Sequence, residues 1–335
     1  MNGHRGGTGP RSDPQEGAAM MVGLHPRQNS CEPSRIVPPI CPTPGCGPSG
    51  PRKPPRISHS SRISRIERKE FDSMHEAMIT FDANARRLEA YLAVPEAAEH
   101  RPAVIVVHEI WGLDDQIKGV ARRFAEQGYV ALAPDLYSGP WREAMRPDNI
   151  TAGMAFLRQA PPEIQRDPSR MEEALASRTP EEQRALRTLM QVMTAGQRAT
   201  FAAELARALT YLRQRPEVDG NRIASLGFCM GGGIAIHLAT LAPELWKTVI
   251  FYGENPPLDR VPAIQARVLG LYGGKDRRIT DLVPEFQRAM EDAGKSFTYK
   301  VYAGAQHAFF NDTRPMYHRE AAQNAWKEVL QFLEA

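Results

Sequence analysis

The stretch GFCMGG, from Gly227 to Gly232, places a cysteine between glycines, after the apolar run RIASL and before GIAIHLATLA. A strand, a nucleophile and a helix in the pattern Gly-x-nucleophile-x-Gly make a sharp turn whose neighbours must lack side chains, so that the nucleophile is exposed above the sheet. Because this turn also begins a helix, its backbone N–H groups and dipole favour an anionic thiolate at Cys229. The alternative is a buried structural cysteine, a common role for a lone free cysteine.

Two polar residues follow the cysteine in the order that a catalytic triad of this kind requires. Asp276 comes directly after a predicted strand at 266–273, and His307 follows a predicted strand at 297–303. Open α/β sheets place their chemistry at the carboxyl ends of strands. We expect His307 to accept and return the proton, and Asp276 to fix the tautomer and orientation of the imidazole. Taken singly, Asp276 is compatible with helix capping and His307 with a surface position.

The stretch HEIWGLDD, from His108 to Asp115, lies at the end of a predicted strand at 103–109. In this architecture that loop donates one backbone N–H to the oxyanion hole, and the residue after the nucleophile donates the other. We assign these roles to the N–H groups of Ile110 and Met230, which would stabilise a developing oxyanion. Glu109 is unusual in this loop, because a carboxylate entering such a site costs free energy unless it has a partner. A salt bridge or a helix-capping role is the alternative.

These residues need a parallel sheet to position them, and the chain from Met74 onward predicts one. Short apolar runs alternate with helical patterns, which favours parallel pairing with right-handed crossovers. We therefore expect an α/β fold with an open, doubly wound, mostly parallel sheet. The later predicted strands lie at 103–109, 129–137, 222–228, 247–253, 266–273 and 297–303, with helices at 114–128 and 324–335.

Two segments depart from this alternation. The runs AMITFD and RLEAYLAV, bounded by Asn84 and Pro95, alternate apolar with polar residues and predict an opening antiparallel hairpin. The stretch 138–214 is longer than one crossover requires and is rich in Arg, Glu and Met. Its TPEEQ motif offers an N-cap and a capping-box glutamate. We expect a helical insert here that forms a small cap over the carboxyl edge of the sheet.

The composition argues against several classes of protein. The chain has 335 residues, of which 42% are hydrophobic and 24% charged, as in globular proteins. No apolar run approaches the roughly 20 residues that a membrane helix needs. The net charge of +3 comes from residues 1–73, which hold 11 Lys and Arg against 6 Asp and Glu, whereas the remainder holds 31 against 33. We therefore predict neither a nucleic-acid nor a membrane partner.

The N-terminal residues 1–73 are predicted to be a disordered extension, because they hold 12 of the 28 prolines and 9 of the 26 glycines. Two alternatives stay open: an organelle presequence, and a start codon assigned too far upstream, with translation beginning at Met74. A zinc site from Cys31, Cys41 and Cys46 would lack a fourth ligand, so we predict no metal and no cofactor. The single cysteine beyond this segment cannot form an internal disulfide, which favours a reducing, cytoplasmic location.

Taken together, HEIWGL, APDLY, GFCMGG, GGKD and GAQHAFFNDTRP resemble the dienelactone hydrolase family of the α/β-hydrolase fold, over residues 74–335. The resemblance implies a cytosolic enzyme without metal or organic cofactor. It also implies carboxymethylenebutenolidase activity, the hydrolysis of a dienelactone to maleylacetate in the degradation of chloroaromatic compounds. By the same resemblance Cys229 is the nucleophile, Asp276 the acid and His307 the base. Glu109 would hydrogen-bond the resting thiol and accept its proton when substrate arrives.

The resemblance is weaker on the substrate side. The dienelactone enzyme binds its substrate carboxylate with two arginines, one of them four residues after the catalytic histidine. That position is Asn311 here, and the nearest arginine is Arg314. The other arginine corresponds to the helical insert, where Arg184 and Arg187 are approximate candidates. Trp111 is a candidate for the wall of the pocket.

We therefore expect a cysteine-dependent hydrolase of a small-molecule ester or lactone that works through an acyl-enzyme. A thioesterase or acyl-transfer enzyme of the same fold is the second hypothesis. A non-catalytic binding protein on a hydrolase scaffold is the third, since a fold does not determine a function. The complete set of four polar residues argues against the third. We expect a monomer or a homodimer.

Overall fold

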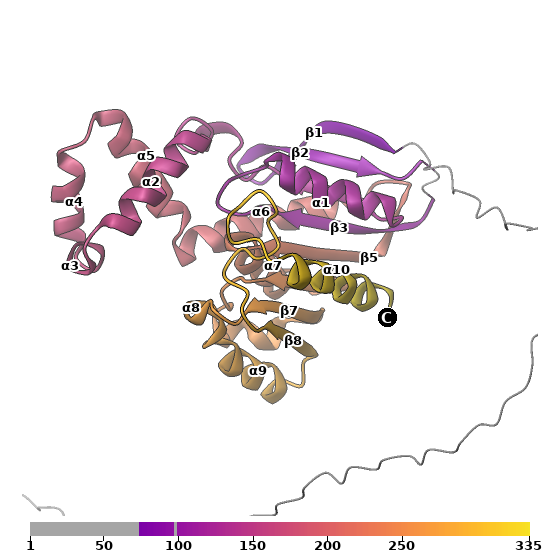
Figure 1. Ribbon diagram of the computed structural model, residues 1–335. Helices are drawn as coiled ribbons and strands as arrows, with labels where there is room; N and C mark the ends of the chain where they lie inside the picture. The colour runs from indigo at the N-terminus through magenta and orange to yellow at the C-terminus, as the bar shows by residue number, and fades with distance from the viewer. Residues whose placement is uncertain (1–73, 97–98) are drawn as a thin grey trace, which may run out of the picture. The chain divides into compact units, whose positions relative to one another are not determined.

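The computed structural model of the protein describes residues 74–96 and 99–335, and these form an eight-stranded sheet in the order β1-β2-β4-β3-β5-β6-β7-β8 (Figure 1). The predicted α/β fold with a mostly parallel sheet is confirmed. The predictions for residues 1–73 lie outside the described residues. The strands are β1 His75–Ala83, β2 Arg86–Val94, β3 Arg101–Val107, β4 Val130–Pro134, β5 Val218–Phe228, β6 Lys247–Phe251, β7 Arg267–Gly273 and β8 Phe297–Tyr302.

The predicted opening hairpin is also confirmed. Strands β1 and β2 pair antiparallel, from His75 opposite Val94 to Ala83 opposite Arg86. Asn84 in the connecting turn has a φ of 56°, a conformation that Asn tolerates better than most residues. Strand β2 runs antiparallel to β4, and every later pair in the sheet is parallel. The parallel strands therefore present their carboxyl ends at one common edge.

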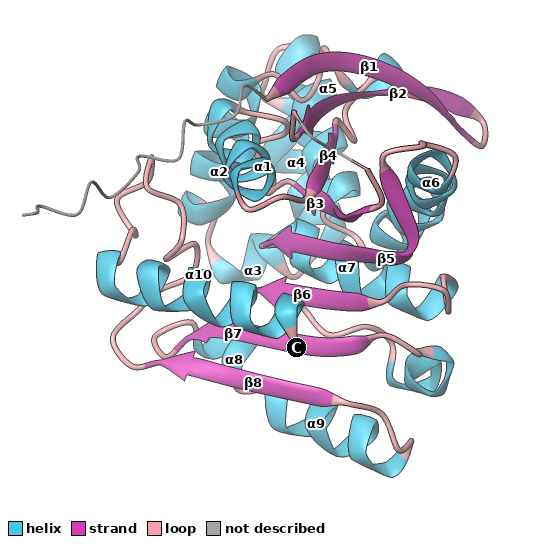
Figure 2. Ribbon diagram, turned by 90° about the vertical axis from the view of Figure 1, so that its right-hand side faces the viewer, coloured by secondary structure: helices cyan, strands magenta, loops and turns pink. Residues whose placement is uncertain are grey.

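Helices cover both faces of the sheet (Figure 2). The apolar sides of α1 and α10 pack on one face, and those of α6, α7 and α9 pack on the other. Strands β4 and β6 are buried along their whole length, as continuous apolar runs predict for central parallel strands. The apolar cores between the sheet and the helices on its two faces hold the carboxyl ends of the strands in place. The helices are α1 Asp115–Glu126, α6 Ala195–Arg213, α7 Met230–Leu241, α9 Val283–Asp292 and α10 Arg319–Glu334.

Local sequence signals determine several helix ends. The side chain of Asp114 caps the first turn of α1, and Gly128, just beyond its end, has a φ of 87°. Thr179 and Glu182 form a capping box at the start of α5, Pro180–Val192. The cap that TPEEQ predicts is thus present.

The long connection between β4 and β5 has two parts. Its last helix, α6, packs against α7 and the sheet and is the crossover helix. The preceding helices α2 to α5 extend beyond the carboxyl ends of the strands (Figure 1), and α4 and α5 share a small apolar core around Leu175. The segment 138–214 predicted as a cap therefore consists of this projecting part and the crossover helix. Its other elements are the 3-10 turn η1 Gly139–Trp141, α2 Pro147–Gln159, α3 Pro162–Gln165 and α4 Pro168–Ala176.

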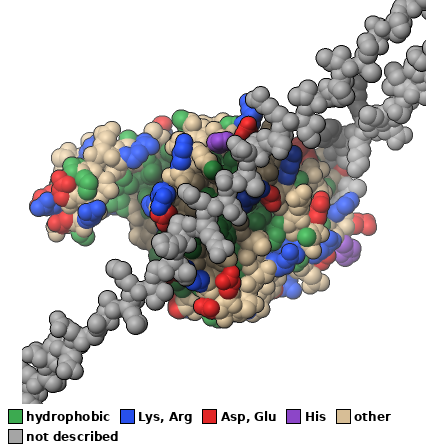
Figure 3. All heavy atoms as spheres, turned by 60° about the horizontal axis from the view of Figure 1, so that its bottom comes forward, with side chains coloured by type: hydrophobic (Ala, Val, Ile, Leu, Met, Phe, Trp, Pro, Cys, Tyr) green, Lys and Arg blue, Asp and Glu red, His purple; other side chains and the backbone are tan. Residues whose placement is uncertain are grey.

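The surface of the projecting part is mixed in charge. Figure 3 shows basic and acidic side chains next to one another at its outer end. Ion pairs such as Arg187 with Glu172 and Arg170 with Asp167 account for this mixture. Among the described residues, no helix combines the length and apolar character needed to cross a membrane. Nor do three or more His, Cys, Asp or Glu residues in the described ranges group to hold a metal ion.

Candidate active site

The turn from β5 into α7 holds Cys229 in a strained backbone conformation, with φ 55° and ψ −119°. Such a conformation costs a non-glycine residue about 1–3 kcal/mol. The Cys229 N–H donates to the Phe251 carbonyl at 2.9 Å. A Cβ on Gly227 would lie 2.0 Å from the Gly231 carbonyl oxygen, and one on Gly231 would lie 2.4 Å from the His108 carbonyl oxygen. Both flanking positions therefore exclude side chains, as the turn motif predicts.

His307 and Asp276 lie at the same edge of the sheet as Cys229. Asp276 follows β7 and precedes the short helix α8, Arg277–Thr280, and His307 lies in the loop after β8. The distance between His307 Nδ1 and Asp276 Oδ2 is 2.5 Å. Because an ionised carboxylate only accepts hydrogen bonds, Nδ1 carries the proton. Nε2 is then the ring nitrogen that remains available for proton exchange.

The neighbours of His307 control its protonation. Burial lowers the pKa of His307, but the charge of Cys229 and hydrogen bonds with Asp276 and Cys229 outweigh this effect and raise that pKa to about 10. The imidazolium is therefore the stable form at neutral pH when it faces a thiolate. A thiolate beside an imidazolium is the activated form of a cysteine nucleophile.

Glu109 is a buried carboxylate, with 2% of its surface exposed. Its Oε1 accepts from the Tyr252 hydroxyl at 3.0 Å, and its Oε2 accepts from Asn311 Nδ2 at 2.8 Å. Burial raises the pKa of Glu109, and the two hydrogen bonds and the charge of His307 oppose that rise. The hydrogen bond to the resting thiol that the family resemblance implies is not formed, because within the described chain the partners of Glu109 are Tyr252 and Asn311.

Asn311 and Tyr252 are two residues of the site that had no predicted functional role. Asn311 Oδ1 accepts from the Thr313 N–H at 3.0 Å and from its hydroxyl at 2.7 Å, which leaves Nδ2 to donate to Glu109. Tyr252 follows β6 with a φ of 42°, and its ring centroid lies 5.1 Å from that of His307. Asn311, at the position where the resemblance places a substrate-binding arginine, thus holds the Glu109 carboxylate instead. Asn311 follows His307 by four residues, and this spacing is the signal that marks Asn311 in the sequence.

The assigned oxyanion donors lie on two adjoining loops. The Met230 N–H is the first of α7, and the first four N–H groups of a helix lack acceptors within it. The close contact of Gly231 with the end of β3 brings the loop of Ile110 beside this turn. Tyr137 contacts both, since its hydroxyl donates to the Ile110 carbonyl at 3.0 Å and lies 4.0 Å from Met230 Sδ. The two loops that carry these N–H groups therefore adjoin each other.

Cys229, His307 and Glu109 line a cavity of about 430 Å³. The helical insert forms part of its wall through Met154 and Arg158 on α2. Most of the wall is apolar, which suits the hydrocarbon part of a substrate. The apolar residues include Trp111, Met154, Met193, Met230, Ile279 and Met316.

The arginines predicted for substrate binding do not reach this cavity. Arg187 on α5 is exposed and pairs with Glu172 at 2.7 Å, away from the lining. The Arg314 guanidinium carbon lies 3.8 Å from the centroid of the Trp111 ring, and Arg314 itself does not line the cavity. Arg158, which the sequence analysis did not single out, lines the cavity and has no hydrogen-bond or ion-pair partner in the described part of the chain.

Two other arginines beside the cavity share one carboxylate. Arg198 and Arg278 each lie 2.7 Å from an oxygen of Glu254. Arg198 also donates to the Met193 carbonyl at the end of α5, at 2.7 Å. These contacts join the insert to the loops after β6 and β7. Arg158 therefore differs from its two arginine neighbours in having no acidic partner among the described residues.

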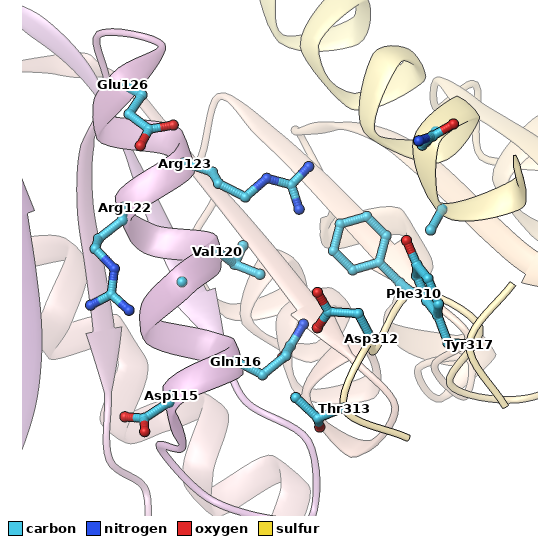
Figure 4. A pocket seen from close by; sticks show the side chains of 13 residues that line it. Asp115, Gln116, Val120, Arg122, Arg123, Glu126, Phe310, Asp312, Thr313 and Tyr317 are labelled. Carbon is cyan, nitrogen blue, oxygen red and sulfur yellow. The ribbon is translucent and has the colours of Figure 1, made fainter. Parts of the chain in front are cut away.

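A second cavity, of about 480 Å³, lies between α1 and the segment that leads into α10 (Figure 4). The Arg123 guanidinium lies 4.0 Å from the centroid of Trp326 there, and Phe310 and Asp312 face the same space. This cavity has walls of mixed charge, and neither a cysteine nor a histidine is among the described residues that line it. Of the two cavities, the one around Cys229 is therefore the candidate active site.

The chain is similar to known proteins over most of its length. The family described as "Dienelactone hydrolase family" matches residues 88–335. A protein of Saccharolobus solfataricus named "Putative carboxymethylenebutenolidase" is 38% identical over 259 residues, covering 77% of this chain and 98% of that protein. One of the same name from Methylorubrum extorquens is 30% identical, covering 72% and 74%. The crystal structure titled "Putative Dienelactone Hydrolase" from Klebsiella pneumoniae matches with a TM-score of 0.58 and 28% identity, covering 78% and 99%.

Proposed function

Since the chain belongs to the dienelactone hydrolase family, a family of hydrolases, we propose that it hydrolyses an ester or lactone bond through Cys229, His307 and Asp276. One observation carries this proposal: the strained Cys229 shares a cavity with a histidine whose Nδ1 lies 2.5 Å from Asp276. A structural cysteine needs neither backbone strain nor a histidine held in this way.

In the acylation step the Cys229 thiolate attacks the carbonyl carbon. A sulfur–carbon bond forms, and an electron pair moves to the carbonyl oxygen, where the N–H groups of Ile110 and Met230 stabilise it. As the carbonyl re-forms, the bond between carbon and the leaving oxygen breaks, and that oxygen takes the proton of His307. With a lactone, the released alcohol stays attached to the acyl group.

In the deacylation step His307, now neutral, takes a proton from water, and the water oxygen attacks the thioester carbon. The sulfur–carbon bond breaks, and the thiolate and imidazolium are restored together with a carboxylic acid product. Asp276 keeps Nδ1 protonated throughout, so that Nε2 makes both transfers. Glu109 is held beside this pair by the Tyr252 hydroxyl and the Asn311 amide.

The cavity favours a substrate with an apolar body and one anionic group. Met154, Met193 and Met316 offer flexible apolar contacts. Arg158 lies on the same face of α2 as Met154, four residues further along, and has no partner among the described residues to neutralise it. A substrate carboxylate at Arg158 would place the hydrocarbon part against these methionines.

Hydrolysis of a dienelactone beside short p-nitrophenyl esters, by the wild type and by Cys229→Ala, tests the proposed reaction. We expect the rate with the better substrate to fall by about 10³-fold or more in the variant, as in other enzymes that lose their nucleophile. Fast lactone opening would identify a dienelactone hydrolase, and ester cleavage alone would assign another ester as substrate. An unchanged rate in Cys229→Ala would contradict the proposal and favour a non-catalytic role for Cys229.

A further inference from the structure

His108 joins the loop after β3 to the loop after β4, and the mechanism above gives it no role. Its ring is fully buried. Nε2 lies 3.1 Å from the backbone nitrogen of Leu136, and Nδ1 lies 2.5 Å from the carbonyl oxygen of Glu109. Because a backbone N–H can only donate, Nε2 is the accepting nitrogen, so Nδ1 carries the proton and donates to Glu109. Burial lowers the pKa of His108, which keeps the ring neutral and this tautomer in place.

The carbonyl that His108 binds belongs to the same peptide group as the Ile110 N–H. In a trans peptide the C=O of Glu109 and the N–H of Ile110 lie in one plane and point in opposite directions. The donors that hold this C=O therefore also set the direction of the N–H. They are His108 Nδ1 at 2.5 Å and, more distantly, the Gly112 N–H at 3.3 Å. The Ile110 N–H is one of the two groups assigned to the oxyanion.

The following peptide is held from the β4 loop as well. The Tyr137 hydroxyl donates to the Ile110 carbonyl at 3.0 Å, and the Tyr137 ring centroid lies 4.9 Å from that of His108. The Tyr137 N–H donates to Asp135 Oδ1 at 2.9 Å, which orders the loop itself. Residues of the APDLY stretch thus fix the peptides on both sides of Ile110, one through Leu136 and His108 and the other through Tyr137.

We propose that His108 is a positioning residue that aims the Ile110 N–H at the substrate oxyanion, with Tyr137 holding the next peptide. This inference rests on the proposed hydrolase function. It gives the APDLY stretch a part in catalysis, although neither this stretch nor His108 lines the cavity around Cys229. A histidine that merely filled space would not need both ring nitrogens bound to two separate loops.

Two variants separate the donor from the ring. His108→Leu removes the hydrogen bond to the Glu109 carbonyl, whereas His108→Asn keeps an N–H donor near the position of Nδ1. We expect kcat for ester hydrolysis to fall roughly 10- to 100-fold in His108→Leu with KM within about twofold, because an oxyanion donor acts mainly in the transition state. His108→Asn should stay within about fivefold of the wild-type kcat, because the donor is retained.

Alkylation of Cys229 by iodoacetamide separates the two roles of His108. If His108 only maintained the structure of the site, its loss would change the alkylation rate as well as kcat. Displacement of iodide from a methylene group develops no carbonyl oxyanion, so the alkylation rate should stay within about twofold of wild type in both variants. Because Cys31, Cys41 and Cys46 are also thiols, peptide mapping assigns the rate to Cys229, and circular dichroism shows that each variant is folded. Tyr137→Phe should lower kcat by a smaller factor, about 3- to 10-fold, because only the second peptide is released.

The inference would be overturned if His108→Leu kept the wild-type kcat per alkylated Cys229. Equal losses of kcat and of alkylation rate in this variant would overturn it as well. If His108→Leu does not fold, Tyr137→Phe decides by the same two readouts, and an unchanged kcat in that variant overturns the inference. Failure of the proposed function would look different, because Cys229→Ala would then hydrolyse the ester as fast as the wild type.

Discussion

Backbone strain is concentrated in the residues around the candidate nucleophile. Cys229, Tyr252 and Ala308 are non-glycine residues with φ values of 55°, 42° and 60°, and all three line the same cavity. Such conformations persist only where the surrounding structure enforces them. Here the tight packing of glycines around Cys229, the hydrogen bond of Tyr252 to Glu109 and the loop after β8 provide that support.

The pH dependence of hydrolysis tests the ion pair at the level of residues. The pKa of His307 is raised to about 10, so its proton is present below that pH and is lost above it. Acylation by an alkyl ester needs this proton for the leaving oxygen. We therefore expect kcat/KM to fall as the pH rises through about 10. In Asp276→Asn the fall should move to lower pH, because a carboxylate that raises the pKa of His307 has been removed.

The measurement is kcat/KM against pH with an alkyl ester, for the wild type and Asp276→Asn. Circular dichroism at each pH serves as the control for unfolding. A falling limb near the ordinary histidine pKa of about 6.5 in the wild type would contradict the ion pair.

Among individual residues, the sequence identifies the proposed catalytic groups more readily than the residues that hold them in place. Cys229, Asp276 and His307 each follow a recognisable strand, so their meeting at one edge is predictable. Asn311 and Glu109 are 202 residues apart in the sequence, and only the folded chain shows their hydrogen bond. Arg187 was a candidate by its position in the insert, but its ion pair with Glu172 holds it outside the cavity.

Among the elements, the turn between β5 and α7 should be the least tolerant of added bulk. A Cβ on Gly227 would lie 2.0 Å from backbone atoms of Gly231, which cannot yield without moving the turn. We expect Gly227→Ala to lower the free energy of unfolding by more than about 3 kcal/mol, at the severe end of overpacking. Gly119→Ala in α1 is the control, because a Cβ there meets nothing within 4 Å.

Urea unfolding of the two variants measures this difference. Gly119→Ala should raise the free energy of unfolding by about 0.5–1 kcal/mol, since alanine is the better helix former. Equal stabilities for Gly227→Ala and the wild type would mean that the turn is looser than these contacts indicate.

The insert should determine substrate preference through Arg158. We expect Arg158→Met to raise KM about three- to fivefold for an ester that carries a free carboxylate, because Arg158 is exposed and an exposed ion pair is worth at most about 1 kcal/mol. KM for a neutral ester of the same length should stay within about twofold. Arg187→Met is the matched control, since Arg187 lies on the same insert but outside the cavity. Equal effects on the two esters would exclude a carboxylate-binding role for Arg158.

The helical patterns of 138–214 do not predict where the projecting part of the insert ends. Helices α5 and α6 follow one another and both have helical signals, yet α6 packs on the sheet as the crossover helix while α5 belongs to the projecting part. The stretch 138–214 is helical by its composition. Which of its helices face the sheet depends on tertiary packing that a single sequence does not reveal.

For the molecule as a whole, the sheet brings together side chains from loops far apart in the chain. The alternation of strands and helices made this sheet predictable, because parallel strands share one carboxyl edge. The substrate is less predictable, because the insert and the loop after His307 shape the cavity. The loops after β3, β5, β6, β7 and β8 contribute Glu109, Cys229, Tyr252, Asp276 and His307 respectively.

If Cys229 is the nucleophile, it becomes acylated during turnover, and the intact mass of the protein detects this acyl group. The wild type is mixed with a p-nitrophenyl ester, quenched in acid and weighed, and the modified peptide is then mapped. We expect a transient mass increase of one acyl group on Cys229, a longer-lived adduct in His307→Ala, which lacks the base for deacylation, and no adduct in Cys229→Ala. Product formation without an adduct on Cys229, or an equal adduct in Cys229→Ala, would contradict the account.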